Sequence, residues 1–455
     1  MARGKKKESL TPEERLQAAL VPESEQPYKA PKNWCWTRLG QLYQINPKNV
    51  ADDFTDAAFI PMEKIAAGFV NEYSFEIQPW SKAKKGHTQF ADGDVAFAKI
   101  SPCFENRKSM LLNGLPNGIG GGTTELVILR QAYMHPKYTF WFVSQEQFIR
   151  GGVATYSGTV GQQRISMDYV RTYPIPVPPL AEQQRIVDRI ESLFAKLDEA
   201  KQKAQESLDS FETRKAAILH KAFTGELTAQ WRKEHGVGME SWENVSVSEI
   251  CHSLKYGTAK KSSSEGTVVV IRMGNLQDGE ISWDDLAYSN DEEDIEKYKL
   301  IPGDVLFNRT NSPALVGKTS IYRGEYPAIY AGYLIKLDYD RSRVIGDYLN
   351  YSLNTVSAKE YCNSVKTDGV NQSNINAKKI GAYRFDMPKI NEQTEIVRLL
   401  NDLLAKEQQA KEVAQGVLEQ IELIKKAILA RAFRGQLGTN DPSEESAIEL
   451  LKTVI

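Results

Sequence analysis

The stretch AEQQRIVDRIESLFAKLDEAKQKAQESLDSFETRKAAILHKAFTGEL, residues 181–227, decides the fold, because nearly the same stretch returns at residues 391–437. The second copy reads NEQTEIVRLLNDLLAKEQQAKEVAQGVLEQIELIKKAILARAFRGQL. From the Glu182/Glu392 pair onward, about 21 of 46 aligned positions are identical without a gap. Such self-similarity indicates an internal duplication, with each residue matched by one 210 positions later.

Both copies have the pattern of a long amphipathic helix. Apolar residues recur at steps of three and four, prolines precede each copy, and Gly225 and Gly435 suit the left-handed residue that closes a helix. About 40 residues make a helix of roughly 60 Å. A stripe of this length needs a partner, and the other copy is the obvious one. The alternative is that each helix packs only on its own domain.

Two related helices that pair about a pseudo-two-fold axis run antiparallel, which would put the preceding domains at opposite ends of a rod. The apolar and alanine positions on the stripe are the predicted contacts. The residues predicted to pair the helices are Ile186, Leu193, Ala204, Ile218, Ile396, Leu403, Ala414 and Ile428.

The segment before each helix predicts a mixed domain. GDV recurs at residues 93–95 and 303–305, and YSGTVGQQRISMDYV corresponds to KTDGVNQSNINAKKI, while most other detail differs. Short strand-like runs alternate with helical ones. The predicted fold class is α+β, with two mixed domains, two long helices pairing as an antiparallel coiled coil, and a pseudo-two-fold duplication. The predicted boundaries are an N-terminal tail 1–30, domains 31–177 and 236–387, helices with linker 178–235 and 388–437, and a C-terminal tail 438–455.

Composition and motifs favour a binding protein over an enzyme. The formal net charge is −2, so any DNA-binding charge must be local. The four cysteines and five histidines are scattered, which predicts no disulfide framework and no metal site. No apolar run reaches transmembrane length, and RGKKKES near the start is expected to be a solvated terminus. SPALVGKTS has serine and proline where a phosphate-binding loop needs glycine and free amides.

The order of mixed domain, PIPVPPLAEQQRIV helix, AFTGELTAQWR, mixed domain, second helix and AFRGQL resembles the specificity subunit of type I restriction-modification systems. The resemblance covers residues from about 31 to 437. It implies two target recognition domains for double-stranded DNA on helices that bind modification subunits, two of them expected, with restriction subunits joining. It also implies a non-catalytic cytoplasmic chain, with S-adenosylmethionine, ATP and Mg²⁺ belonging to partner subunits. A coiled-coil scaffold joining two non-DNA interaction domains is the alternative.

Sequence readout needs donors and acceptors at base edges and basic groups at phosphates. Loops rich in amide and basic residues occur at equivalent places in both domains, and ordinary polar turns are the alternative interpretation. The candidate DNA contacts are Lys84, Lys85, Lys99, Arg107, Lys108, Gln162, Gln163, Arg164, Arg272, Asn275, Asn308, Arg309, Asn311, Lys318, Asn371, Gln372 and Asn374. Two unlike domains predict a bipartite, asymmetric target.

Overall fold

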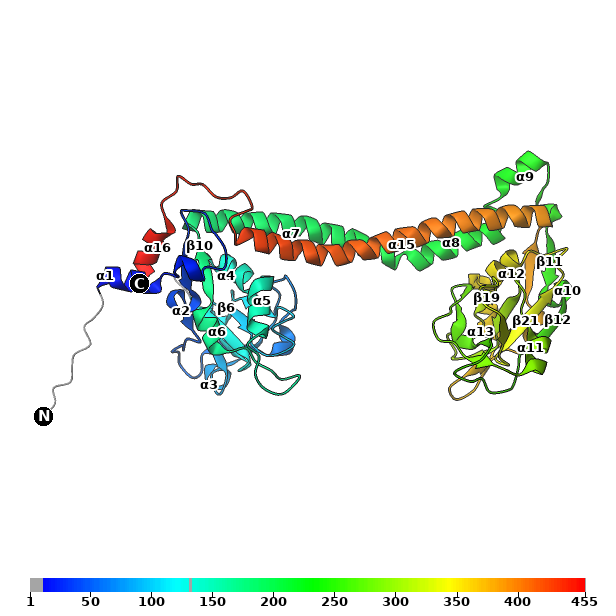
Figure 1. Cartoon of the computed structure of the whole chain (residues 1–455), viewed down its shortest axis with the longest axis horizontal. Helices are drawn as coiled ribbons and strands as arrows, with labels where there is room; N and C mark the ends of the chain where they lie inside the picture. The colour runs from blue at the N-terminus through cyan, green and yellow to red at the C-terminus, as the bar shows by residue number, and fades with distance from the viewer. Residues whose placement is uncertain (1–10, 131–132, 455) are drawn as a thin grey trace. The chain divides into compact units, whose positions relative to one another are not determined.

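The computed structural model describes residues 11–130 and 133–454. The chain forms two compact units, Met1–Ala204 with Gly416–Ile455, and Gln205–Gln415. Each unit combines one mixed domain with segments of two long helices (Figure 1). Helix α15 (Ile390–Ala432) contributes to both. The basic RGKKKES stretch lies outside the described residues.

The first unit carries the N-terminal mixed domain. Its strands are β1 Cys35–Arg38, β2 Gln44–Ile45, β3 Asp56–Ile60, β4 Glu76–Pro79, β5 Thr88–Ala91, β6 Val95–Ala98, β7 Ser109–Leu111, β8 Ile119–Gly122, β9 Leu126–Arg130 and β10 Pro174–Val177. Its helices are α1 Pro12–Ala19, α2 Leu39–Leu42, α3 Trp80–Ala83, α4 Pro136–Val143, α5 Glu146–Val153, α6 Met167–Thr172, α16 Ala447–Val454 and most of α7 Leu180–Asp209.

The second unit carries the other mixed domain. Its strands are β11 Glu243–Ser246, β12 Cys251–Tyr256, β13 Val268–Ile271, β14 Leu276–Gln277, β15 Glu280–Ile281, β16 Tyr288–Ser289, β17 Val305–Asn308, β18 Thr310–Asn311, β19 Thr319–Ile321, β20 Ala328–Tyr330, β21 Leu334–Tyr339, β22 Thr367–Asp368, β23 Ser373–Asn374 and β24 Arg384–Met387. Its helices are α8 Phe211–Phe223, α9 Ala229–His235, α10 Val247–Ile250, α11 Glu292–Tyr298, α12 Gly346–Leu353, α13 Val356–Val365 and α14 Ala377–Gly381.

The two domains share the topology of their central sheets. In the first, β6 pairs antiparallel with β7 and β9, and in the second, β17 pairs antiparallel with β19 and β21. A second sheet in each domain contains one parallel pair, β3–β8 and β13–β20. The predicted α+β class and the duplication are therefore confirmed, and β6 and β17 begin 210 positions apart, as the GDV repeat predicts.

The Glu-Gln pair that opens each helical repeat fastens the helix to its domain. Gln183 accepts a hydrogen bond from the backbone N–H of His135 at 2.8 Å, and Gln393 accepts one from Ile345 at 2.9 Å. Each amide also donates to a proline carbonyl just before the helix, at 2.9 and 2.8 Å. Both glutamines are buried, so these bonds satisfy polar groups that would otherwise be costly to bury.

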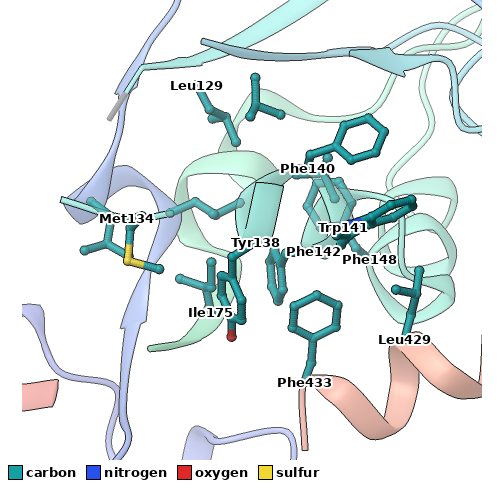
Figure 2. Packing of buried hydrophobic residues seen from close by; sticks show 14 of the residues in the cluster. Leu129, Met134, Tyr138, Phe140, Trp141, Phe142, Phe148, Ile175, Leu429 and Phe433 are labelled. Carbon is teal, nitrogen blue, oxygen red and sulfur yellow. The ribbon is translucent and has the colours of Figure 1, made fainter. Parts of the chain in front are cut away.

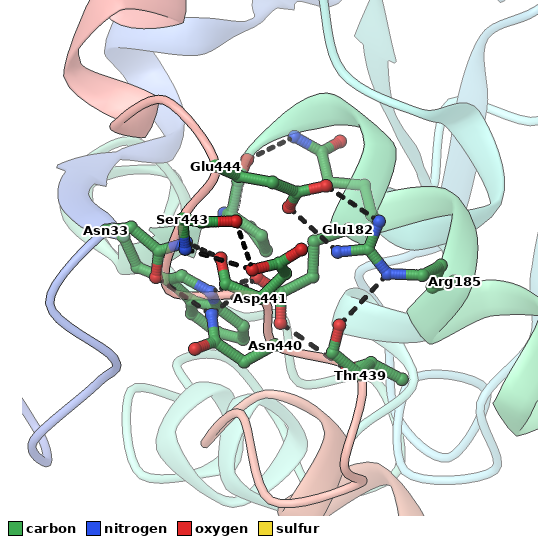
Figure 3. Close-up of polar contacts among 11 residues, drawn as sticks. Asn33, Glu182, Arg185, Thr439, Asn440, Asp441, Ser443 and Glu444 are labelled. Atoms are coloured by element: carbon green, nitrogen blue, oxygen red, sulfur yellow. Dashed lines mark hydrogen bonds and ion pairs between the residues drawn. The ribbon is translucent and has the colours of Figure 1, made fainter.

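The glutamate of the first pair joins three segments of the first unit. Glu182 is buried and accepts hydrogen bonds from the Trp34 indole at 2.7 Å and from Asn440 at 2.9 Å (Figure 3). Arg185, one turn later, makes two 2.8 Å bonds to Glu444. The segment around Trp34 and the segment after α15 are thus tied to the same turn of α7.

The glutamate of the second pair has an equivalent role in the second unit. Glu392 accepts from the Trp242 indole at 3.0 Å, from Thr228 at 2.7 Å and from Arg232 at 2.6 Å. Arg232 and Glu392 are both buried, so this ion pair is shielded from water. Removing one partner of a buried ion pair leaves the other charge buried without compensation, which strongly destabilises the fold.

Paired helix segments run antiparallel within each unit. In the first unit, Arg185 near the start of α7 reaches Thr439 beyond the end of α15, whereas Asp198 farther along α7 reaches Lys425. In the second unit, Lys411 lies 4.4 Å from the Phe211 ring centroid and Glu407 binds Arg214 at 2.7 Å. Rising residue numbers on one helix therefore meet falling numbers on the other.

The predicted pairing residues fall into two groups. Four are buried: Ile186, Ala204, Ile396 and Ala414. The other four are half-buried: Leu193, Ile218, Leu403 and Ile428. Beside three of these, the next residue is the buried one: Phe194, Leu219 and Leu429. At these positions the buried face of the helix is displaced by one residue from the predicted face. The helix ends pack against a domain as well as against the other helix.

The first helical repeat is interrupted where the prediction expects one continuous helix. Helix α7 ends at Asp209 and α8 begins at Phe211, while α15 runs unbroken through the equivalent region. The Ser210 hydroxyl donates to the backbone carbonyl of Glu206 at 2.7 Å. Serine side chains that bind a carbonyl one turn back bend or weaken helices.

The repeated helix endings, KAAILHKAF and KKAILARAF, each carry a phenylalanine that docks on a tyrosine. Phe433, the residue that follows α15, lies 5.2 Å from Tyr138 between ring centroids, and Phe223 of α8 lies 5.1 Å from Tyr348 (Figure 2 shows the first pair). Tyr138 belongs to the first domain and Tyr348 to the second. Each helix therefore ends on the domain of the other repeat, which explains why the ending recurs.

Helices occur in the described parts of both predicted tails. Helix α1 and helix α16 pack in the first unit, and Ala19, Ala447 and Leu451 are buried. The Ala447 N–H donates to the Asn33 carbonyl at 2.9 Å. The tails predicted at residues 1–30 and 438–455 thus contain short helices in their described parts, and apolar residues of both helices join the core of the first unit.

Candidate nucleic-acid interface

The GTVGQQRIS stretch of the first domain forms a hairpin beside the KISPC loop. Ser157 and Arg164 exchange backbone hydrogen bonds at 3.1 and 2.9 Å, and Ile165 N–H donates to the Lys99 carbonyl at 3.0 Å. Ile165 is buried and anchors the base of the hairpin, whereas the tip at residues 158–162 is exposed. Two of the predicted loops therefore lie side by side.

The second domain contains the same hairpin in the same register. Thr367 pairs with Asn374, and Asn374 also pairs with Thr310. Ile375 N–H donates to the Arg309 carbonyl at 2.9 Å, and Ile375 is buried. Every partner is displaced by 210 positions from its counterpart in the first domain. The candidate residues Asn308 and Arg309 are thus brought beside the segment that holds Asn371, Gln372 and Asn374.

Amide side chains on or beside these hairpins differ in their exposure and in the hydrogen bonds they already make. Gln162, Asn371 and Gln372 are exposed at the tips, and Gln163 is half-buried. Asn374 donates to the Thr310 hydroxyl at 2.7 Å. The Asn311 side-chain oxygen accepts from the Ser312 N–H at 2.8 Å. The exposed tip amides can both donate to and accept from base edges.

Arg164 is the cation at the base of the first hairpin, and it is already paired. Its guanidinium binds Glu125 through several hydrogen bonds, the shortest at 2.7 Å, and this bonding lowers the pKa of the Glu125 carboxyl. Lys99, whose carbonyl accepts from the Ile165 N–H, is half-buried. A phosphate approaching Arg164 would share the guanidinium with a carboxylate that stays ionised.

Two basic residues of the first domain hold the fold together. Arg107 donates to the Ser144 carbonyl at 3.0 Å, pairs with Glu146, and lies 4.9 Å from the Phe69 ring centroid. Lys108 donates to the Met62 carbonyl at 2.9 Å. These bonds occupy both cations within the domain, so they are weaker candidates for DNA contact than the sequence indicates.

At the end of α3, Lys84 and Lys85 lie near the surface. Lys84 forms an ion pair with Asp53, and Lys85 is exposed. Among the predicted residues of the first domain, Lys85 therefore keeps the most accessible charge for a phosphate.

Two predicted amides of the second domain are interior residues. Asn275 is 3% exposed and bonds the backbone of Arg272, Ser282 and Asp285. Asn308 is fully buried in β17. Neither can reach a base edge without unfolding its surroundings, which corrects their selection as DNA contacts.

The remaining predicted cations of the second domain are partly engaged. Arg272 forms a 2.9 Å ion pair with Asp285, and Lys318 donates to Gln277 at 2.9 Å. The Arg309 guanidinium stacks over the Tyr256 ring, 4.7 Å from its centroid.

The candidate contacts are chosen for hydrogen-bonding groups and positive charge. They therefore omit Val160 and Val370 at the hairpin tips, which the repeat alignment pairs with each other.

The described residues define a class of protein by their architecture: two diverged mixed domains, each bearing an equivalent hairpin, on paired antiparallel helix segments. The family model described as "Type I restriction modification DNA specificity domain" matches residues 31–208 and 239–416. The chain therefore belongs to this family, and the resemblance seen in the sequence is confirmed.

Individual relatives agree with this assignment. The chain is 38% identical over 229 residues to the type I restriction enzyme EcoAI specificity subunit of Escherichia coli, covering 50% of this chain and 38% of the relative. It is 36% identical over 220 residues to the EcoEI specificity subunit of Escherichia coli, covering 47% and 37%. The matched part thus spans less than two fifths of each relative.

The fold is also that of a known structure. The HsdS subunit from Thermoanaerobacter tengcongensis matches with a TM-score of 0.66 and 21% identity, covering 91% of this chain and all of that chain. Across residues 11–130 and 133–454, no helix has the length and apolarity to cross a membrane. The same residues contain no group of three or more metal-ligating side chains.

Proposed function

We propose that this chain is the DNA sequence-specificity subunit of a type I restriction-modification complex. It reads an asymmetric, bipartite double-stranded target, one half-site for each mixed domain. The observation that carries the proposal is the pair of hairpins with identical register in domains that otherwise differ. A conserved scaffold with diverged surfaces suits two readers of unlike sequences. Family membership and the specificity subunits among its relatives support it.

Recognition would combine amide readout with phosphate contacts. Exposed glutamine and asparagine side chains can bond both the acceptor and the donor of adenine in the major groove. Accessible cations such as Lys85 would bind phosphates and fix the register without reading sequence. The neutral overall balance of charge confines the attraction to these surfaces.

In this proposal the chain performs no chemistry itself and works in the cytoplasm. Two modification subunits bound to the paired helices would supply S-adenosylmethionine-dependent methylation. Restriction subunits would add ATP- and Mg²⁺-dependent cleavage. The chain's own contribution is to bind, orient and space these partners on the target.

Methylation is expected to require the partners. The pure chain, incubated with labelled S-adenosylmethionine and DNA, should transfer no label, while addition of a cognate modification subunit should give labelling of target-containing duplexes only. Filter-bound radioactivity measures this. Labelling by the pure chain, or equal labelling of duplexes with and without the target, would contradict the proposal.

A further inference from the structure

The two hairpins present the same apolar residue at their tips. Val160 is 96% exposed and Val370 is fully exposed, and they occupy equivalent positions 210 residues apart. Each is followed two residues later by an exposed glutamine, Gln162 or Gln372. A single exposed apolar side chain is ordinary on a protein surface. Its repetition at equivalent tips of a duplicated ribbon points instead to a contact that both domains share.

A backbone hydrogen bond joins the same two positions at both tips, with donor and acceptor exchanged between the domains. The Gln162 N–H donates to the Thr159 carbonyl at 2.9 Å, and in the second domain Gly369 N–H donates to the Gln372 carbonyl at 2.7 Å. Gly158 and Gly161 adopt positive φ, which lets the first ribbon turn sharply. Buried isoleucines fix both bases. The valines therefore stand on narrow, braced projections.

The surroundings favour DNA over protein as the partner. A protein-docking surface presents a contiguous apolar patch. Val160 stands instead among glycine, threonine and glutamine, and Val370 among Asp368, glycine, asparagine and glutamine. A two-stranded ribbon is narrow enough to enter a DNA groove. Apolar side chains that enter a groove wedge between base steps in many architectural proteins.

The two valines must also have the same role in both domains. Two domains that read unlike half-sites share only what every duplex offers: groove walls, stacked bases and backbone. Val160 is kept as Val370 although Thr159 and Gly161 are replaced by Gly369 and Asn371, which suits such a common feature. The glutamines Gln162 and Gln372 are kept too, but an amide that both donates and accepts can pair with different base edges. We infer that Val160 and Val370 are apolar wedges that enter the DNA groove at each half-site and strengthen binding without reading sequence. This inference rests on the proposed function.

The test uses the full chain assembled with its modification subunits. Val160→Ser and Val370→Ser should each weaken binding about tenfold, to target and scrambled duplexes alike, because each removes one buried apolar contact. The ratio of the affinity for target DNA to the affinity for scrambled DNA should stay unchanged in each variant. Val160→Leu and Val370→Leu keep an apolar tip and should bind nearly as the parent does. Val356→Ser, an exposed valine at the start of α13, is the matched control and should bind like the parent.

A fluorescent 2-aminopurine placed in each half-site adds a readout of base stacking. Each serine variant should reduce the signal of unstacking in its own half-site only. Unchanged affinity, a changed preference for particular bases, or lost assembly with partner subunits while DNA binding stays intact would overturn the inference. Preference of the parent chain for the target over scrambled DNA tests the proposed function separately.

Discussion

Replacing Glu392 by alanine is expected to lower the free energy of unfolding by about 3–5 kcal/mol, because the buried Arg232 guanidinium would lose its counter-charge. The Trp242 indole and the Thr228 hydroxyl would lose their acceptor as well. Urea denaturation of the full chain, followed by circular dichroism, measures the loss. Glu392→Gln should fall between the parent and alanine, since it keeps an acceptor but no charge.

Glu412 provides the matched control on the same helix. It is exposed and accepts a hydrogen bond from Gln408 at 2.9 Å. Glu412→Ala should change stability by less than about 0.5 kcal/mol, as surface substitutions usually do. A Glu392→Ala variant as stable as Glu412→Ala would show that the buried network does not hold the helix to its domain.

Phe433→Ala is expected to cost about 3–5 kcal/mol, the usual range for removing a buried aromatic side chain. Phe433 is fully buried at the end of α15 and contacts the rings of Tyr138 and Phe142 at centroid distances of 5.2 Å (Figure 2). Thermal unfolding of the full chain measures the effect. The cavity would lie where the helix of one repeat meets the domain of the other.

Two further variants separate packing from helix propensity. Phe433→Leu keeps most of the volume and should cost less than the alanine variant. Ile424→Ala removes a side chain of α15 that is 43% exposed and should cost about 1 kcal/mol or less. Equal losses at Phe433 and Ile424 would argue against docking of the helix ending on the first domain.

Much of this architecture follows from the sequence because an internal duplication shows directly which residues of the two copies are equivalent. The offset of 210 predicts which strands, hairpins and helix ends correspond, and the structure places them so. The offset cannot say which of two adjacent apolar residues is buried. Ile218 and Leu219 are both apolar, and only the packing of the domain against the helix selects Leu219.

The candidate site is harder to predict than the fold. Asn275 and an exposed amide such as Gln372 look alike in sequence, yet Asn275 satisfies backbone groups inside the domain. Arg107 likewise serves the packing of its own domain. Which partners a polar side chain finds depends on tertiary contacts between segments that are distant in the sequence. The sequence does not predict helices α1 and α16 for a similar reason, since their apolar residues are buried only by contacts between segments that are distant in the sequence.

The central claim is that the two domains read separate half-sites, and selection from random duplexes tests it most directly. The full chain with its modification subunits should select a bipartite, asymmetric target with unspecified base pairs between unlike halves. Gln162→Ala should relax one half and Gln372→Ala only the other, each with a loss of about 1–3 kcal/mol of discrimination. A continuous palindrome, or a variant in one domain that alters both halves equally, would contradict the account.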